Sequence, residues 1–135
     1  MFDMHFDLLT LAYMAKKQGR EEELKRVLAN FNYQNILGVS ANLYYMSRQE
    51  MTEELKYPEE IDVLEMFKEA KISLKEVSRT VAGYNAQILY SIEGCDYIDD
   101  LQTLDSLYNN GLDAILPVWN TQNKYGSGNR SDQGL

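Results

Sequence analysis

The first residues of the chain carry side chains that could bind a cation. In Met1–Thr10 the polar residues Asp3, His5 and Asp7 alternate with apolar ones, and His5 is the only histidine. Successive side chains of a β-strand point to opposite faces, so the alternation predicts a strand with these polar side chains on one face. An imidazole nitrogen and a carboxylate oxygen are both zinc ligands. A short exposed strand with a solvated polar face explains the same segment, and the segment alone slightly favours it.

The rest of the chain alternates between apolar segments of strand length and amphipathic segments of helical period. Such βα alternation predicts an α/β fold of about four βα units, with a parallel sheet and right-handed crossovers. The expected strands are residues 1–7, 36–45, 87–92 and 112–119. The expected helices are Leu8–Asn30 with a break at Gly19, Pro58–Val81, and a short helix capped by Asp99 or Asp100.

Ligands of parallel α/β folds bind at the carboxyl ends of the strands. Two of the expected strand ends carry groups that can bind a metal, His5 with Asp7 at the first strand and Glu93 at the third. We therefore expect these three side chains to meet at one edge of the sheet. The other two ends carry Tyr44 and Tyr45, and Trp119 and Asn120.

Length and composition describe an ordinary globular domain. A chain of 135 residues with 44% hydrophobic residues can bury one core. A net charge of −8 argues against a nucleic-acid-binding surface, which needs basic side chains. The single cysteine, Cys95, excludes an intrachain disulfide and suits a reducing compartment, so we expect a cytoplasmic protein. No apolar run is long enough to cross a membrane, so no membrane partner is expected.

Three motifs follow one another along the chain, each at the end of an expected strand. They are Asp3-x-His5-x-Asp7-Leu8, Ser91-Ile92-Glu93-Gly94 and Leu116-x-x-Trp119-Asn120-x-x-Asn123-x-x-Gly126. Together they resemble the membrane (renal) dipeptidase family of the amidohydrolase superfamily, and the resemblance covers nearly the whole chain. A lone His-x-Asp pair would be weak, whereas three motifs in order make a specific match.

The resemblance implies a (β/α)8 barrel of TIM type with two zinc ions at the carboxyl ends of its strands. By this resemblance His5 and Asp7 are ligands of one zinc, and Glu93 bridges both. The ion pair would activate a water molecule for the hydrolysis of a dipeptide, which makes the family one of metallopeptidases. Asp3 is expected to orient the ligands from behind them. An aspartate paired with a polar group of the barrel interior explains Asp3 about equally well.

Side chains near the strand ends complete the implied site. Many relatives have a substrate-contacting histidine where this chain has Trp119, which is therefore expected to wall the pocket. Asn120 and Tyr45 are further candidates for the substrate pocket. Cys95 follows the Glu93 motif closely, but a small buried thiol is its commoner state and the one we expect.

The chain departs from the family in length and in histidine count. Such barrels need upwards of about 200 residues, and the relatives take two further zinc histidines from later strands. Residues 1–135 are therefore expected to be the N-terminal half of a metal-dependent hydrolase barrel, inactive by itself and able to bind at most one zinc. The open strand edges of such a half predict self-association or pairing with the missing C-terminal half.

A protein of another class remains the alternative. In that interpretation the chain is a non-catalytic α/β module that binds a metal or a partner. The single histidine favours the module for this chain. The three motifs indicate that the chain descends from a hydrolase.

Overall fold

The computed structural model describes residues 1–44, 62–120 and 122–128. Within them the chain forms a four-stranded parallel sheet in the order β1-β2-β3-β4, which confirms the predicted α/β class and sequential strand order. The strands are β1 (Phe2–Phe6), β2 (Gly38–Tyr44), β3 (Gln87–Glu93) and β4 (Ala114–Leu116).

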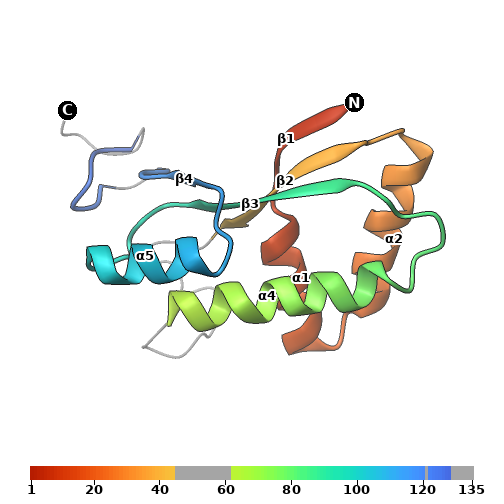
Figure 1. Ribbon diagram of the computed structural model, residues 1–135, viewed down its shortest axis with the longest axis horizontal. Helices are drawn as coiled ribbons and strands as arrows, with labels where there is room; N and C mark the ends of the chain where they lie inside the picture. The colour runs from red at the N-terminus through yellow and green to blue at the C-terminus, as the bar shows by residue number, and fades with distance from the viewer. Residues whose placement is uncertain (45–61, 121, 129–135) are drawn as a thin grey trace.

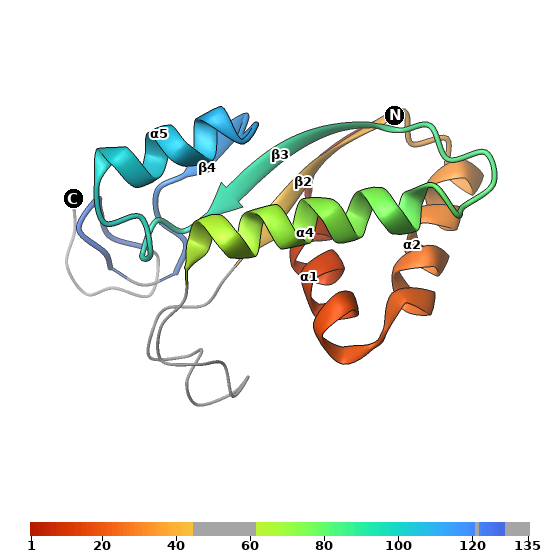
Figure 2. The same ribbon diagram turned by 60° about the horizontal axis from the view of Figure 1, so that its bottom comes forward.

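The described helices lie on one side of the sheet (Figure 1; Figure 2 shows the same arrangement turned by 60°). They are α1 (Leu8–Gln18), α2 (Glu21–Tyr33), α4 (Val63–Ser78) and α5 (Leu101–Asn109). Gly19 adopts a left-handed conformation (φ 65°) between α1 and α2, where the break was predicted. Asp62 and Asp100 cap α4 and α5 by accepting backbone N–H groups. The predicted start at Pro58 lies outside the described residues.

The core lies between the sheet and helices α1, α2 and α4. Strand β2 is buried along nearly its whole length, as its apolar sequence predicted. Val39, Ala41 and Leu43, at odd-numbered positions, are fully buried. The even-numbered positions, which face the other way, carry small or polar residues. The two faces of β2 therefore serve different purposes, one the core and the other the candidate site.

Strand β1 departs from strict alternation. Phe2 pairs with Gly38 but Phe6 pairs with Ala41, because the register shifts between Asp3 and Phe6. Gly38 and Ala41 face opposite sides of the sheet, so Phe2 and Phe6 do as well. The prediction that the polar residues of β1 share one face and the apolar residues the other is therefore wrong. Asp3 pairs with the core-facing Val39, so it lies on the opposite face from His5, and the physical reason is an irregularity of the bulge kind. Phe6 packs edge-on against Phe31 of α2, at 5.3 Å between ring centroids.

Strand β4 is shorter than predicted. It ends at Leu116, directly before Pro117, whose ring nitrogen cannot donate to a ladder. The backbone N–H groups of Gly94 and Cys95 donate to the carbonyls of Leu116 and Pro117 at 2.9 and 3.0 Å. These bonds hold the loop after β3 beside the end of β4. None of the described helices combines the length and the apolar character needed to cross a bilayer.

A glycine is required where Phe2 crosses β2. A Cβ atom at Gly38 would lie 2.1 Å from the Phe2 ring. We expect Gly38→Ala to lower the free energy of unfolding by about 1 kcal/mol, the low end for overpacking, because the half-exposed ring can turn into solvent. Chemical denaturation measures this. In a Phe2→Ala background, Gly38→Ala should leave the free energy of unfolding unchanged. An equal loss in both backgrounds would show that the Phe2 ring is not the cause.

Strands β1 and β4 form the edges of the described sheet, and each exposes apolar side chains, including Met4 at 68% and Leu116 at 40%. Such edges pair readily with other chains. We expect sedimentation velocity to show concentration-dependent self-association at micromolar protein, reduced by Met4→Lys. Leu101→Lys, on exposed α5, is the matched control and should leave the association unchanged. A monomer at all concentrations would contradict the prediction.

Candidate metal centre

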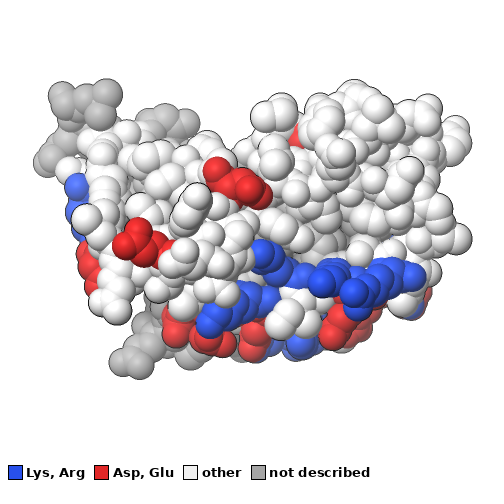
Figure 3. All heavy atoms as spheres, viewed as in Figure 1, with Lys and Arg blue, Asp and Glu red and all other residues white. Residues whose placement is uncertain are grey.

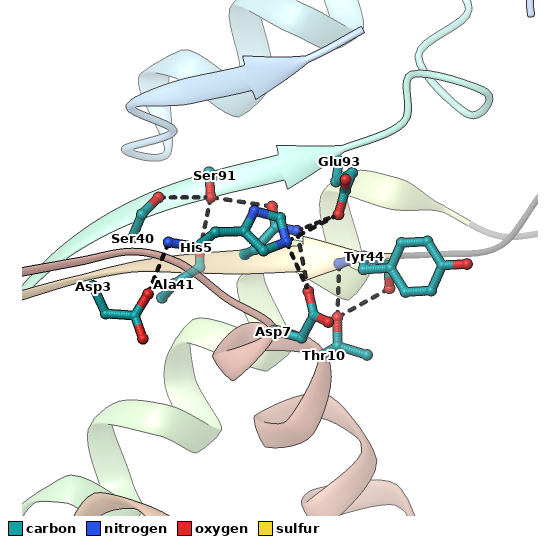
Figure 4. A network of polar contacts seen from close by, with 10 residues as sticks. Asp3, His5, Asp7, Thr10, Ser40, Ala41, Tyr44, Ser91 and Glu93 are labelled. Atoms are coloured by element: carbon teal, nitrogen blue, oxygen red, sulfur yellow. Dashed lines mark hydrogen bonds and ion pairs between the residues drawn. The ribbon is translucent and has the colours of Figure 1, made fainter. Parts of the chain in front are cut away.

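Three potential metal ligands meet at the carboxyl end of the sheet (Figure 4). The Nε2 atom of His5 lies 3.4 Å from Oε2 of Glu93 and 3.9 Å from Oδ1 of Asp7. One ligand atom from each of the three residues lies within 4.8 Å of the others. The structure thus brings together the three side chains that the sequence predicted as metal ligands. The 3.4 Å between Nε2 of His5 and Oε2 of Glu93 is within the distance of about 5 Å that two ligand atoms of one zinc ion can span.

His5 reaches this point through the irregular end of β1. The register shift between Asp3 and Phe6 lets Phe6 face the helices while the imidazole of His5 extends toward Glu93 (Figure 4). Oδ1 of Asp3 accepts a hydrogen bond from the backbone N–H of His5 at 3.1 Å. Asp3 therefore acts on the backbone beside a ligand. Its role in orienting the ligands stays a prediction.

Asp7 occupies the N-cap position of α1, yet its side chain makes no capping hydrogen bond. Its carboxylate instead contacts His5 and the side chain of Asn42. The N-terminal end of a helix favours negative charge, so an acidic side chain suits this position. The Thr10 hydroxyl holds this end of α1 against β2, since it donates to the Tyr44 carbonyl at 3.0 Å and accepts from the Tyr44 N–H at 2.7 Å.

Glu93 is the last residue of β3 and is only 7% exposed. Gly94 follows with φ 83°, a conformation that favours glycine, and turns the chain away from the sheet. The side chains of His5 and Asp7 are about half exposed, at 50% and 54%. The cluster therefore has a buried carboxylate on one side and opens to solvent on the other.

A fully buried amide lies beneath the cluster, and sequence reasoning missed it. The Nδ2 group of Asn42 donates to Oδ1 of Asp7 at 3.2 Å and to Oε2 of Glu93 at 3.0 Å. The signal was present in the sequence. Ser40 and Asn42 occupy alternate positions of an otherwise apolar strand, which places both on one face. Without the strand pairing, nothing in the sequence connects Asn42 to Asp7.

The candidate substrate-pocket residues are only partly placed. The Trp119 ring packs edge-on against the Tyr44 ring, with 4.6 Å between centroids. Tyr44 is the register partner of Glu93, so Trp119 stands at the carboxyl end of the sheet and remains 39% exposed. Asn120 is 7% exposed. Tyr45 lies outside the described residues. Contact of these residues with a substrate stays a prediction.

The electrostatic setting suits a cation. Within the described parts of the chain, the carboxylates of Asp7 and Glu93 lie within 4 Å of the His5 imidazole and of no lysine or arginine side chain. On the face shown in Figure 3, the Lys and Arg side chains lie mainly over α4. Two carboxylates without a basic partner, beside an imidazole nitrogen, form a donor set that zinc accepts.

Comparison with protein-family models, with curated proteins and with solved structures finds no match to this chain. The dipeptidase resemblance therefore rests on the three sequence motifs. The spacing of His5, Asp7 and Glu93 in the structure is compatible with it.

Cys95 lies near the site but outside the cluster. It is a free thiol, 2% exposed, as the sequence predicted. Burial raises the pKa of the thiol, and the charge of Asp96 raises it further. We expect iodoacetamide to modify Cys95 at neutral pH at least about tenfold more slowly in the folded chain than in urea, because the thiolate is the nucleophile. Mass spectrometry measures the rate. Equal rates would show that the thiol is accessible.

Proposed function

We propose that this chain supplies four βα units and one side of the metal site of a zinc-dependent dipeptidase-type hydrolase. The single observation that carries the proposal is the convergence of His5, Asp7 and Glu93, which are far apart in sequence, at one point of the sheet. Three sequence motifs in the order of a dipeptidase barrel support the same assignment.

The donor geometry fits a zinc ion. Two ligands at about 2.1 Å from a tetrahedral zinc lie roughly 3.4 Å apart. Nε2 of His5 and Oε2 of Glu93 have this separation, 3.4 Å, Oδ1 of Asp7 lies 3.9 Å from the same nitrogen, and one ligand atom from each residue lies within 4.8 Å of the others. Three protein ligands leave a fourth position open, as in catalytic zinc sites.

A zinc ion bound here would supply a Lewis acid that acidifies water and polarises a carbonyl group. The three candidate ligands would hold such an ion between the protein interior and solvent. Glu93 holds a carboxylate on the buried side of the cluster, while His5 and Asp7 form its solvent-exposed side. A small substrate can therefore approach from the exposed side. The Trp119 ring, packed against the ring of Tyr44, also lies at this end of the sheet.

The proposed site is incomplete for dipeptide hydrolysis. The family resemblance implies two zinc ions, and Glu93 is the ligand that would reach both. No second histidine exists in the chain, and self-association would only bring further copies of His5. We therefore propose that the chain binds one zinc ion and that the remaining ligands come from later βα units of a (β/α)8 barrel, added at the β4 edge.

A non-catalytic metal-binding module is the second candidate function. The observation that favours it is the single histidine, because the dinuclear site implied by the resemblance takes further histidines that this chain lacks. This module would bind zinc through the same three residues but would not hydrolyse a peptide bond, even when joined to later units. A zinc-binding measurement tests the metal site that both candidate functions share. A measurement of dipeptide turnover distinguishes the hydrolase from the module.

We expect isothermal titration and metal analysis to give one zinc ion per chain, because three protein ligands suffice for one open site. His5→Ala and Asp7→Ala should each abolish this binding. Asp105→Ala removes an exposed carboxylate from α5 and is the matched control, which should bind zinc like the wild type. A wild type that binds no zinc would overturn the proposed site.

The same zinc-loaded chain should not hydrolyse dipeptides at a measurable rate, because the second ion lacks its ligands. Turnover that disappears in Glu93→Gln, or a stoichiometry of two zinc ions, would show that the chain completes its site by itself. Turnover gained when later barrel units are supplied would favour the hydrolase over the module.

A further inference from the structure

Asn42 joins the two carboxylates of the proposed metal centre. Its side chain is fully buried, with 0% exposed. The amide nitrogen lies 3.2 Å from Oδ1 of Asp7 and 3.0 Å from Oε2 of Glu93. These are the oxygens that also lie nearest Nε2 of His5. One side-chain nitrogen thus limits how far the two candidate ligand oxygens can move apart.

The amide is itself held in one orientation. Oγ of Ser91 donates to Oδ1 of Asn42 at 3.1 Å, and Oγ of Ser40 lies 3.1 Å from Oγ of Ser91. Ionised carboxylates only accept hydrogen bonds, so the N–H₂ group of Asn42 must face Asp7 and Glu93. Its oxygen must then accept from Ser91, and Ser91 can accept from Ser40. The Ser91 hydroxyl also lies 3.4 Å from the Ala41 carbonyl. When Ser40 donates to Ser91 and Ser91 donates to Asn42, the donors of this series all point toward the carboxylates, which strengthens each bond.

We infer that Asn42 is a positioning residue of the metal centre, oriented by Ser91 and Ser40. The inference rests on the proposed function, since it assigns Asn42 to the same site. An amide suits this role because it donates two hydrogen bonds without adding positive charge. Asp7 and Glu93 keep both negative charges for the cation, whereas a lysine here would neutralise one of them. Each ligand oxygen also keeps a second lone pair for the metal.

The burial of these groups indicates why the network should matter for binding. Ser40, Ser91 and Asn42 are 8%, 3% and 0% exposed, so water cannot replace a lost hydrogen bond readily. Without the amide, the two carboxylates would repel one another, and the half-exposed side chain of Asp7 would be free to turn into solvent. The cation would then have to bring the two carboxylates together, and the free energy spent on this movement would lower its affinity. Groups that orient metal ligands typically contribute 10- to 100-fold to affinity.

The test compares Asn42→Leu, of similar shape but without donors, with Ser91→Ala, which frees the amide but leaves its contacts with the carboxylates. Ser73→Ala is the matched control, because Ser73 is also buried and donates to the Ala12 carbonyl at 2.7 Å between α4 and α1. Zn²⁺ and Co²⁺ alone are the probes. Titration gives the affinities, and the visible absorption of bound Co²⁺ reports the ligand geometry, which a loss of stability alone would not change.

We expect Asn42→Leu to weaken the binding of both ions by about 10- to 100-fold and to alter the Co²⁺ spectrum. Ser91→Ala should weaken binding by a smaller factor in the same direction, and Ser73→Ala should bind like the wild type. Unchanged affinity and spectrum in Asn42→Leu, with binding still abolished by His5→Ala, would overturn the inference alone. A wild type that binds neither ion would overturn the proposed function and the inference with it.

A metal-free measurement covers the case in which Asn42→Leu does not fold. In the wild type, the side-chain N–H₂ hydrogens of Asn42 should exchange with solvent at least about tenfold more slowly than those of an exposed asparagine such as Asn110, as NMR can measure. Exchange as fast as at Asn110 would show that the amide does not hold the carboxylates. That result overturns the inference whatever the zinc affinity.

Discussion

The parallel pairing of β2 with both β1 and β3 is the constraint on which the candidate site depends. In register, Tyr44 of β2 lies beside Glu93, and Asn42 lies beside Ser91. On the other side of β2, the shifted register of β1 brings His5 and then Asp7 to the same edge. Parallel strands end together, so residues separated by more than eighty positions become neighbours. A change in either register would separate the ligands without removing any of them.

The central strand meets two conflicting demands. Its odd-numbered side chains, such as Val39 and Leu43, fill the core against the helices. Its even-numbered ones include Ser40 and Asn42, which are buried as well and would be costly without partners. The hydrogen bonds to Ser91, Asp7 and Glu93 satisfy them. The polar face of the sheet is thus stable because its groups bond one another, and the metal ligands are part of that arrangement.

The geometry supports metal binding more directly than it supports catalysis. One imidazole and two carboxylates can hold one ion with an open side. Hydrolysis of a peptide bond by two ions needs ligands that this chain lacks, since His5 is its single histidine. The exposed edges of β1 and β4 leave room for further strands in the same sheet. In the proposed function, metal binding and strand pairing at the exposed edges are therefore connected.

The alternation of apolar and amphipathic segments determined the class of fold and the strand order, and with them the meeting of His5, Asp7 and Glu93, because parallel strands place their ends at one edge. Only the tertiary structure decided the rest. The shifted register of β1, which re-aims Phe2 and Phe6, depends on pairing with β2 that no local pattern encodes. The place of Asn42 between Asp7 and Glu93 likewise depends on contacts across three elements, since a hydrogen bond between distant residues forms only when the fold brings them together.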